Sequence, residues 1–146
     1  MLQVIADTSF LIYIANHPTP ILRMLEERVG AYRLIVPTPV MEELERLVRG
    51  GGKRARQARA ALRYAETLPT QAMAGTAVDD ALIAHAKAHG LALATLDGAL
   101  LRKARGLGIT TISARRGRLW MEGVGRNPLQ GGVAPSDSSY KIGRPK

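Results

Sequence analysis

Short apolar runs alternate with longer segments of helical spacing along most of the chain. Residues 2–6 form a run that is short and rich in branched side chains, which is typical of a buried strand. Residues 33–37, 91–97 and 109–113 repeat this pattern, and residues 117–121 predict a short edge strand. The chain therefore carries four clear strand signals and one weaker one.

The segments between these runs predict helices, because proline stands near their starts and glycine near their ends. Pro39 begins one such segment, and Gly50 to Gly52 end it. We expect helices at residues 8–16, 18–29, 38–49, 53–68, 75–89 and 98–108. Alternating strands and helices of this length predict an α/β fold with a mainly parallel sheet. The expected architecture is a three-layer α/β/α domain.

The length and composition favour one domain followed by a tail. With 146 residues, of which 46% are hydrophobic, the chain can bury a single core. From Gly123 onward, Gly, Pro and Ser replace the apolar periodicity. We therefore expect a domain at residues 1–122 and a basic tail without a core of its own at residues 123–146.

The sequence also narrows the cellular setting. It has no cysteine, which excludes disulfides, thiolate metal sites and a cysteine nucleophile. No apolar run approaches the length of a membrane span, and no basic segment precedes the first apolar run. We expect a soluble cytoplasmic protein with no membrane partner.

Positive charge is the strongest signal in the composition. A formal net charge of +9 and a sequence pI of about 10.6 predict a polyanionic partner such as nucleic acid. Candidate RNA contacts lie on the helix expected at residues 53–68 and just after residue 113. They are Lys53, Arg54, Arg56, Arg59, Arg63, Arg115, Arg116 and Arg118. A solvated basic surface is the simpler alternative.

Two aspartates occupy matching positions near strand ends. Asp7 and Asp97 each close an apolar run and precede a helical segment. In an open parallel sheet, the carboxyl ends of the strands form the ligand crevice. Because aspartate is also a favoured helix cap, capping is the alternative for each residue taken alone.

Two acidic pairs add carboxylates to the same predicted edge. One of Glu42 and Glu43 must lie beside an apolar helical stripe, and Asp79 and Asp80 open another helix, where they also suit the helix dipole. Carboxylates that converge in one crevice repel one another. A divalent cation with oxygen ligands, Mg²⁺ or Mn²⁺, is the simplest neutraliser.

A second metal pattern is weaker. His85 and His89 stand four residues apart on an expected helix, which is a spacing found in zinc sites. No third ligand is evident in the sequence, so an ordinary polar helix face is the better interpretation.

Four segments resemble, in order, the signature segments of PIN-domain ribonucleases. They are VIADTSFLI, VPTPVMEELERL, VDDALIAHAKAHG and LATLDGALLRKARGLGI. The resemblance implies a metal-binding acidic quartet of Asp7, Glu43, Asp80 and Asp97. It favours Glu43 because the family's acid directly precedes leucine, and Asp80 because DALIA matches the family pattern, with Asp79 as the alternative ligand. Thr8 and Thr95 match hydroxyl positions that orient the ligands.

The resemblance also implies an activity. It indicates an endoribonuclease that uses Mg²⁺ or Mn²⁺ to cleave single-stranded or locally opened RNA. The second and third segments look more like the branch that processes ribosomal RNA in archaea and in the eukaryotic small-subunit processome, which implies an rRNA precursor as partner. A VapC-type toxin, which would pair with an antitoxin, is the second interpretation. An RNA-binding module without catalysis is the alternative outside enzymes, and a homodimer is a further expectation.

Overall fold

The computed structural model describes residues 1–18, 20–74 and 78–123, so the predicted tail lies outside the described residues apart from Gly123. The strands within these residues are β1 (Leu2–Ala6), β2 (Tyr32–Pro37), β3 (Thr70–Gln71), β4 (Ala92–Ala94), β5 (Thr111–Arg115) and β6 (Arg118–Glu122). The helices are α1 (Thr8–Asn16), α2 (Ile21–Val29), α3 (Thr38–Val48), α4 (Gly52–Ala65), α5 (Val78–His89) and α6 (Gly98–Gly106).

The strands form one six-stranded sheet in the order β3-β2-β1-β4-β5-β6. Every neighbouring pair is parallel except β5 and β6, which form an antiparallel hairpin. The prediction of an α/β fold with a mainly parallel sheet is therefore confirmed. Edge strand β6 was expected from the sequence, and its antiparallel direction follows from the two-residue turn that joins it to β5.

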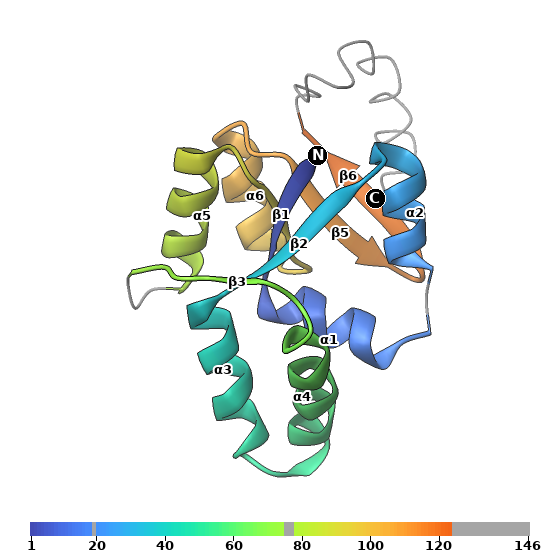
Figure 1. Cartoon of the computed structure of the whole chain (residues 1–146), viewed down its shortest axis with the longest axis vertical. Helices are drawn as coiled ribbons and strands as arrows, with labels where there is room; N and C mark the ends of the chain where they lie inside the picture. Colours follow the sequence, from blue (N-terminus) through green and yellow to red (C-terminus); the bar gives the residue numbers. More distant parts are fainter. Residues whose placement is uncertain (19, 75–77, 124–146) are drawn as a thin grey trace.

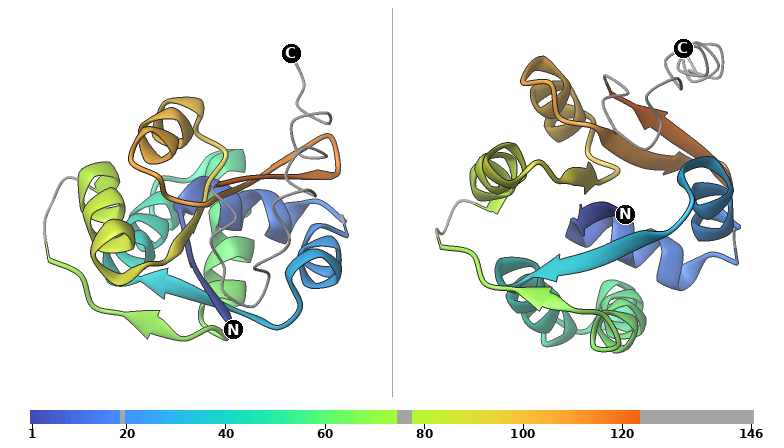
Figure 2. Two further views of the ribbon diagram at one scale, coloured as in Figure 1. Left: turned by 90° about the horizontal axis from the view of Figure 1, so that it is seen from above. Right: turned by 45° about the horizontal axis from the view of Figure 1, so that its top comes forward.

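Helices lie on both sides of this sheet (Figure 2). Helices α5 and α6 contact each other and pack on β4 and β5, whereas α1 lies on the other side with α4. Helices α3 and α4 pack side by side and extend beyond the ends of the strands (Figure 1). In the described part of the chain, no helix has the length and apolar character needed to cross a membrane.

Small and branched side chains determine how closely these layers approach. The central strand β1 is fully buried at Val4, Ile5 and Ala6. Helix α4 buries alanines at positions 55, 58, 61 and 65, and their three- to four-residue spacing gives it a flat apolar face. This face lets α4 lie close against α1 and α3, so its long basic side chains are left on the outside.

The expected strand bounds shift where backbone groups have other partners. Strand β4 ends at Ala94, short of the predicted residue 97, because the following residues turn into the start of α6. Strand β5 begins at Thr111 and not at residue 109, since the amide of Ile109 donates to the Ala104 carbonyl at the end of α6. Strand β3 was missed because it has two residues and no apolar run.

The β5–β6 turn is fixed by its backbone conformation. Arg116 and Gly117 have φ of 53° and 75°, the pair of positive values that a type I′ hairpin turn requires. The amide of Gly117 donates to the Tyr13 hydroxyl at 3.0 Å, which ties the turn to α1. The hairpin is thereby held beside the carboxyl edge of the sheet.

Candidate active site

The order of the strands places a crevice at the centre of the sheet. From β1 the chain moves outward to β2 and β3, then crosses to β4 on the other side of β1. Such a reversal is a topological switch point, where the carboxyl ends of parallel strands open a ligand crevice. A cavity of about 500 Å³ lies at this edge, and its acidic lining consists of Asp7, Glu43, Asp79 and Asp97.

Asp7 follows β1 directly and is fixed by one buried and one partly buried side-chain hydrogen bond. Its Oδ2 accepts from the Thr95 hydroxyl at 2.7 Å and from the Ser9 hydroxyl at 3.2 Å. Its amide donates to the Ala94 carbonyl at 2.8 Å, which joins the end of β1 to β4. Asp7 is 7% exposed, and Thr95 is fully buried. The carboxylate therefore has little freedom to rotate.

Burial raises the pKa of Asp7, and the nearby charge of Asp79 adds to the rise. The hydrogen bonds from Thr95, the Thr8 backbone and Ser9 oppose it, because they favour the charged carboxylate. A carboxyl group that is buried, which disfavours its charged form, and is held in place by several hydrogen-bond donors is typical of a functional site.

Glu43 reaches the cavity from α3. Its Oε1 accepts from the Thr8 hydroxyl at 2.6 Å, and Thr8 itself is 6% exposed at the start of α1. Glu42, the other member of the pair, is exposed and does not line the cavity. The structure thus places the residue that the resemblance favoured in the site, with the predicted threonine in contact with it.

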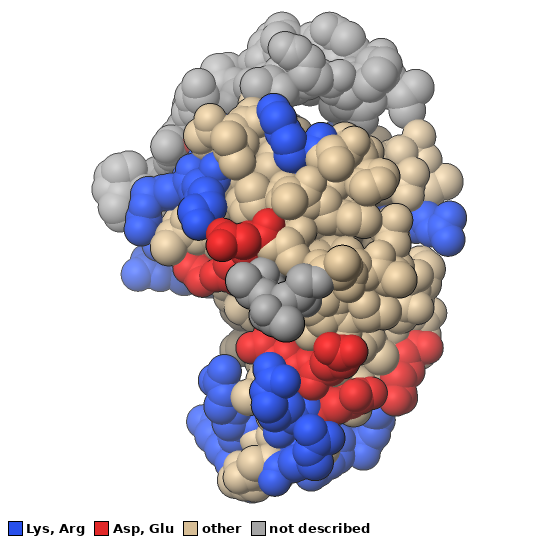
Figure 3. Space-filling view, turned by 90° about the vertical axis from the view of Figure 1, so that its left-hand side faces the viewer, with Lys and Arg blue, Asp and Glu red and all other residues tan. Residues whose placement is uncertain are grey.

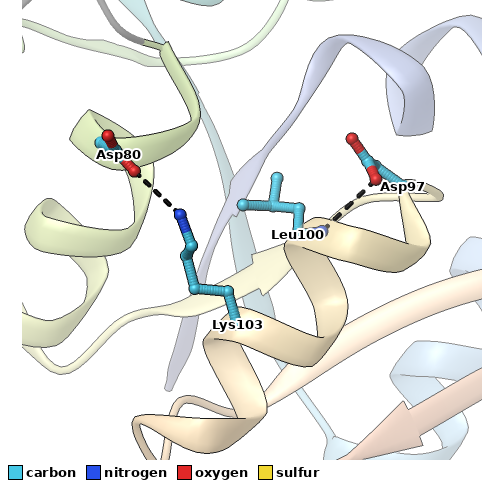
Figure 4. Close-up of polar contacts among 4 residues, drawn as sticks. All are labelled: Asp80, Asp97, Leu100 and Lys103. Atoms are coloured by element: carbon cyan, nitrogen blue, oxygen red, sulfur yellow. Dashed lines mark hydrogen bonds and ion pairs between the residues drawn. The ribbon is translucent and has the colours of Figure 1, made fainter.

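Asp97 serves as the helix cap of α6 at the same edge. Its Oδ1 accepts from the amide of Ala99 at 2.9 Å and from that of Leu100 at 3.3 Å, the second of which Figure 4 shows. Its own amide donates to the Thr95 hydroxyl at 3.1 Å, so Thr95 links Asp97 to Asp7. Asp97 therefore both caps α6 and lines the cavity.

The Asp79/Asp80 pair divides between two surroundings. Asp80 Oδ1 accepts from Nζ of Lys103 at 3.1 Å on the exposed surface between α5 and α6, and it does not line the cavity (Figure 4). Asp79 does line it, and partial burial together with the charges of Asp97 and Glu43 raises its pKa. Successive helix residues point about 100° apart, so only one aspartate of the pair faces the crevice. The placement favours Asp79, whereas the resemblance favoured Asp80.

The chemistry of the donor set fits a hard divalent cation. The four acids offer only carboxylate oxygens, and their crowding is relieved by positive charge. Across residues 1–18, 20–74 and 78–123, no three Asp, Glu or His side chains already surround one ion position. The residues that would hold Mg²⁺ or Mn²⁺ are Asp7, Glu43, Asp79 and Asp97, after rotation of the less constrained side chains.

Basic side chains flank the acidic cavity. The five basic residues predicted on α4 are all exposed, and Arg54 also lines the cavity with Gln57. The three arginines of the β5–β6 hairpin are exposed as well, beside a turn that contacts Tyr13 of the cavity wall. Figure 3 shows Lys and Arg gathered over the end formed by α3 and α4, next to a band of Asp and Glu, with further basic side chains beyond the band.

The histidine pair takes no part in this cavity. The rings of His85 and His89 lie 4.3 Å apart, and burial lowers the pKa of His85, with the charge of His89 adding to the effect. The zinc interpretation finds no third ligand among the described residues.

Sequence reasoning missed four polar residues of the cavity, which are Ser9, Tyr13, His17 and Gln57. Ser9 donates to Asp7, and its oxygen accepts from the amide of Leu96 at 2.9 Å. Tyr13 and Gln57 line the wall from α1 and α4. Ser9 follows Asp7 in the segment DTS and was visible as a second hydroxyl, whereas Tyr13 and Gln57 enter only through helix packing.

Comparison with known proteins agrees with this geometry. Residues 4–118 match the family described as "PIN like domain". The structure of the PIN domain endonuclease Utp24 is similar at 25% identity with a TM-score of 0.65, over 83% of this chain and 91% of that chain. A domain of a functionally unknown protein from Methanocaldococcus jannaschii DSM 2661 has the same fold, at 18% identity and a TM-score of 0.61, over 81% and 94% of the two chains.

No curated protein sequence matches the chain. The family match and the endonuclease neighbour nonetheless confirm the resemblance drawn from the four ordered segments. The chain belongs to the PIN-like domain family, within the PIN nuclease superfamily.

Proposed function

We propose that this protein is a divalent-metal-dependent endoribonuclease whose catalytic acids are Asp7, Glu43, Asp79 and Asp97. The observation that supports it most is the convergence of these four carboxylates in one cavity at the switch point of the sheet. Burial raises the pKa of Asp7 and of Asp79, and neighbouring carboxylates add to the rise, so the charged cluster is stabilised by a cation.

The four acids divide the work according to how firmly each is held. Asp7 is the rigid member, because Thr95 and Ser9 both donate to it. Glu43 and Asp79 approach from helices and adjust to the substrate. When bound, Mg²⁺ or Mn²⁺ lowers the pKa of a coordinated water and neutralises charge on the attacked phosphate.

RNA is the proposed substrate because basic side chains border the acids. A phosphate backbone is repelled by the acidic cavity itself, so affinity must come from the flanking arginines. Arg54 lies in the cavity wall and α4 carries four more basic residues, which gives the backbone a path to the acids. With aromatics at only 4% of the chain, we expect recognition of backbone and shape more than of bases.

An rRNA precursor is the proposed physiological target. The support is the similarity to the endonuclease Utp24 together with the second and third sequence segments. The VapC-type alternative predicts an antitoxin partner, and co-purification of the protein with a small tightly bound protein would favour it. A homodimer belongs to the same proposal and is checked by sedimentation of the pure protein.

The decisive experiment measures cleavage and binding on one preparation. Labelled single-stranded RNAs of several sequences are incubated with Mn²⁺, Mg²⁺ or EDTA, and binding is measured at two salt concentrations. We expect cleavage with a metal and none in EDTA, and we expect Asp97→Asn to stop cleavage while RNA binding persists.

If wild type and Asp97→Asn both bind RNA and neither cuts it with either metal, the binding-module alternative replaces this proposal. An rRNA precursor fragment belongs in the substrate panel, because a processing enzyme acts on folded RNA. Cleavage that continues in EDTA contradicts the metal mechanism.

A further inference from the structure

A second cavity adjoins the acidic one on the same edge of the sheet. Its volume is about 360 Å³, within the range of small-ligand sites, and it lies between α6 and the β5–β6 hairpin. Leu96 lines both cavities, and Gly98 of the second cavity is the neighbour of Asp97 in the first. A molecule bound in the acidic cavity can therefore continue into the second one.

The charge of this second cavity is opposite to that of the first. Its wall carries Arg102, Arg105 and Arg115. Arg105 is paired with Glu122 at 2.6 Å, but within the described residues neither Arg102 nor Arg115 forms an ion pair. Two cations without acidic partners beside one cavity are suited to a phosphate group, which arginine binds through its planar fork of donors.

The position of Arg102 directs this charge toward the acids. Its guanidinium folds back along the first turn of α6, since a Cβ built on Gly98 would lie 3.4 Å from Nη1 of Arg102. The arginine thus lies next to Gly98, the residue that follows Asp97, in the wall of the second cavity. A phosphate held there lies next to the acidic centre without entering it.

The same cavity offers a surface for a base. Trp120 lines it and pairs across the hairpin with Ser113, which is also a lining residue. The Trp120 Nε1 is buried and has no hydrogen-bond partner in the part of the chain that the structure describes. Because this nitrogen is itself covered, a ligand in the cavity meets the half-buried ring of Trp120 and not its N–H. Indole rings also stack on nucleic-acid bases with little sequence preference.

We propose that this cavity, lined by Arg102, Arg115 and Trp120, binds a nucleotide of the RNA strand that adjoins the cleaved phosphate. The inference rests on the proposed ribonuclease function and deepens it. Arg102 and Arg115 hold the phosphate, and Trp120 contacts the base or its sugar. The site fixes the strand's register against the acids, so its loss weakens substrate binding more than turnover at saturation.

Trp120 is itself the reporter for the test, because it is the single tryptophan in the chain. A short oligouridylate is titrated into the intact protein in EDTA, and tryptophan fluorescence is excited at a wavelength that uracil does not absorb. We expect a saturable change in emission. Arg102→Ala and Arg115→Ala should each weaken binding about tenfold, as expected for a lost charge-assisted contact.

Arg33→Ala is the matched control. Arg33 is exposed near the start of β2, at the opposite end of the sheet. Its replacement by alanine removes the same charge as Arg102→Ala or Arg115→Ala. It should change the affinity less than twofold. Trp120→Phe, with binding followed by anisotropy of labelled RNA, checks the contribution of the indole without emptying the wall, and circular dichroism verifies the fold of each variant.

Three results overturn the inference. Oligouridylate binding with no change in Trp120 emission places the RNA elsewhere. If Arg33→Ala and Arg102→Ala weaken binding equally, the RNA responds to general surface charge and not to this cavity. Inorganic phosphate that produces the same emission change at the same concentration as uridine monophosphate indicates a simple anion site. Cleavage with Mn²⁺ is assayed in parallel. If a preparation cuts RNA yet fails these tests, the inferred nucleotide site is wrong and the proposed function still stands.

Discussion

The acidic cavity and the basic surface of α4 are built in opposite ways. In the cavity, hydroxyls hold the carboxylates, as the buried Thr95 and the half-buried Ser9 hold Asp7. On α4, the buried face is alanine and the arginines extend into solvent. Chemistry on a phosphate requires fixed atoms, whereas a polyanion of variable shape is attracted by charge alone. Substitutions in the two regions should therefore fail differently.

The largest difference is expected between two adjacent aspartates. Asp79→Asn should lower the rate of RNA cleavage about 10³-fold, equivalent to roughly 4 kcal/mol of barrier, because it removes a carboxylate from the cavity. Asp80→Asn is the matched control, and it should cost only a few-fold, since Asp80 pairs with Lys103 on the surface. Single-turnover cleavage with Mn²⁺ measures both. The reverse ranking would restore Asp80 to the quartet and contradict the placement described here.

Removing charge from α4 should affect binding and leave the chemistry intact. Arg56→Ala with Arg59→Ala should lower RNA affinity by about 10–100-fold at low salt and reduce the salt slope by about 2, since each phosphate contact contributes about one unit. Turnover at saturating RNA should stay close to that of wild type.

The control for this pair removes the same charge elsewhere. Arg23→Ala with Arg33→Ala takes two exposed arginines from α2 and β2. If both double variants change the slope equally, α4 has no special role and the RNA responds to net charge only.

The hydroxyl of Thr95, which connects Asp7 to Asp97, should affect metal affinity and activity without contacting the substrate. Thr95→Val keeps the buried volume but removes the donor to Asp7 and the acceptor of the Asp97 amide. Loss of such a partner typically costs about 10–100-fold in metal affinity or activity. Calorimetric titration with Mn²⁺ measures the affinity, and Thr95→Ser should restore most of it. A Thr95→Ser variant as weak as Thr95→Val would indicate a packing role.

The smallest effect concerns stability and its pH dependence. Because burial raises the pKa of Asp7 in the folded protein, the folded state holds more protons than the unfolded state once the pH exceeds the ordinary value of 3.8. Stability is therefore lost as the pH rises from there through the folded pKa. Asp7→Asn should remove this loss and raise the unfolding temperature at neutral pH in EDTA, by about 2–4 °C per kcal/mol relieved.

The test is whether Asp7→Asn is more or less stable than wild type, and at which pH. Below pH 3.8, both proteins carry an uncharged group at position 7, so the advantage of Asp7→Asn should disappear. Thermal unfolding followed by circular dichroism across this range measures it. A variant that is less stable than wild type at neutral pH would show that the Thr95 and Ser9 hydrogen bonds outweigh the cost of burial.

The elements that depend on local pattern were predictable from the sequence, and those that depend on packing were not. The apolar runs around β1, β2 and β4 marked the sheet, and the motif that contains Asp7 placed an acid at its edge. Strand β3 was not predicted, because its pairing with β2 comes from tertiary contact and not from a pattern in its two residues. The choice between Asp79 and Asp80 also needed the structure, since it depends on how α5 is rotated about its axis.

The amide of Asp7 has a consequence for how the protein inactivates on heating. Its hydrogen bond to the Ala94 carbonyl, at 2.8 Å, lies between the two central strands, in a region with no solvent exposure at Ala6 or Ala94. This amide should exchange with deuterium only when the whole sheet opens, whereas terminal and surface amides exchange through local fraying. Loss of the Asp7 backbone from its place therefore requires global unfolding. Under conditions where each opening leads to exchange, the activation energy of deuterium uptake at this one position should equal that of heat inactivation.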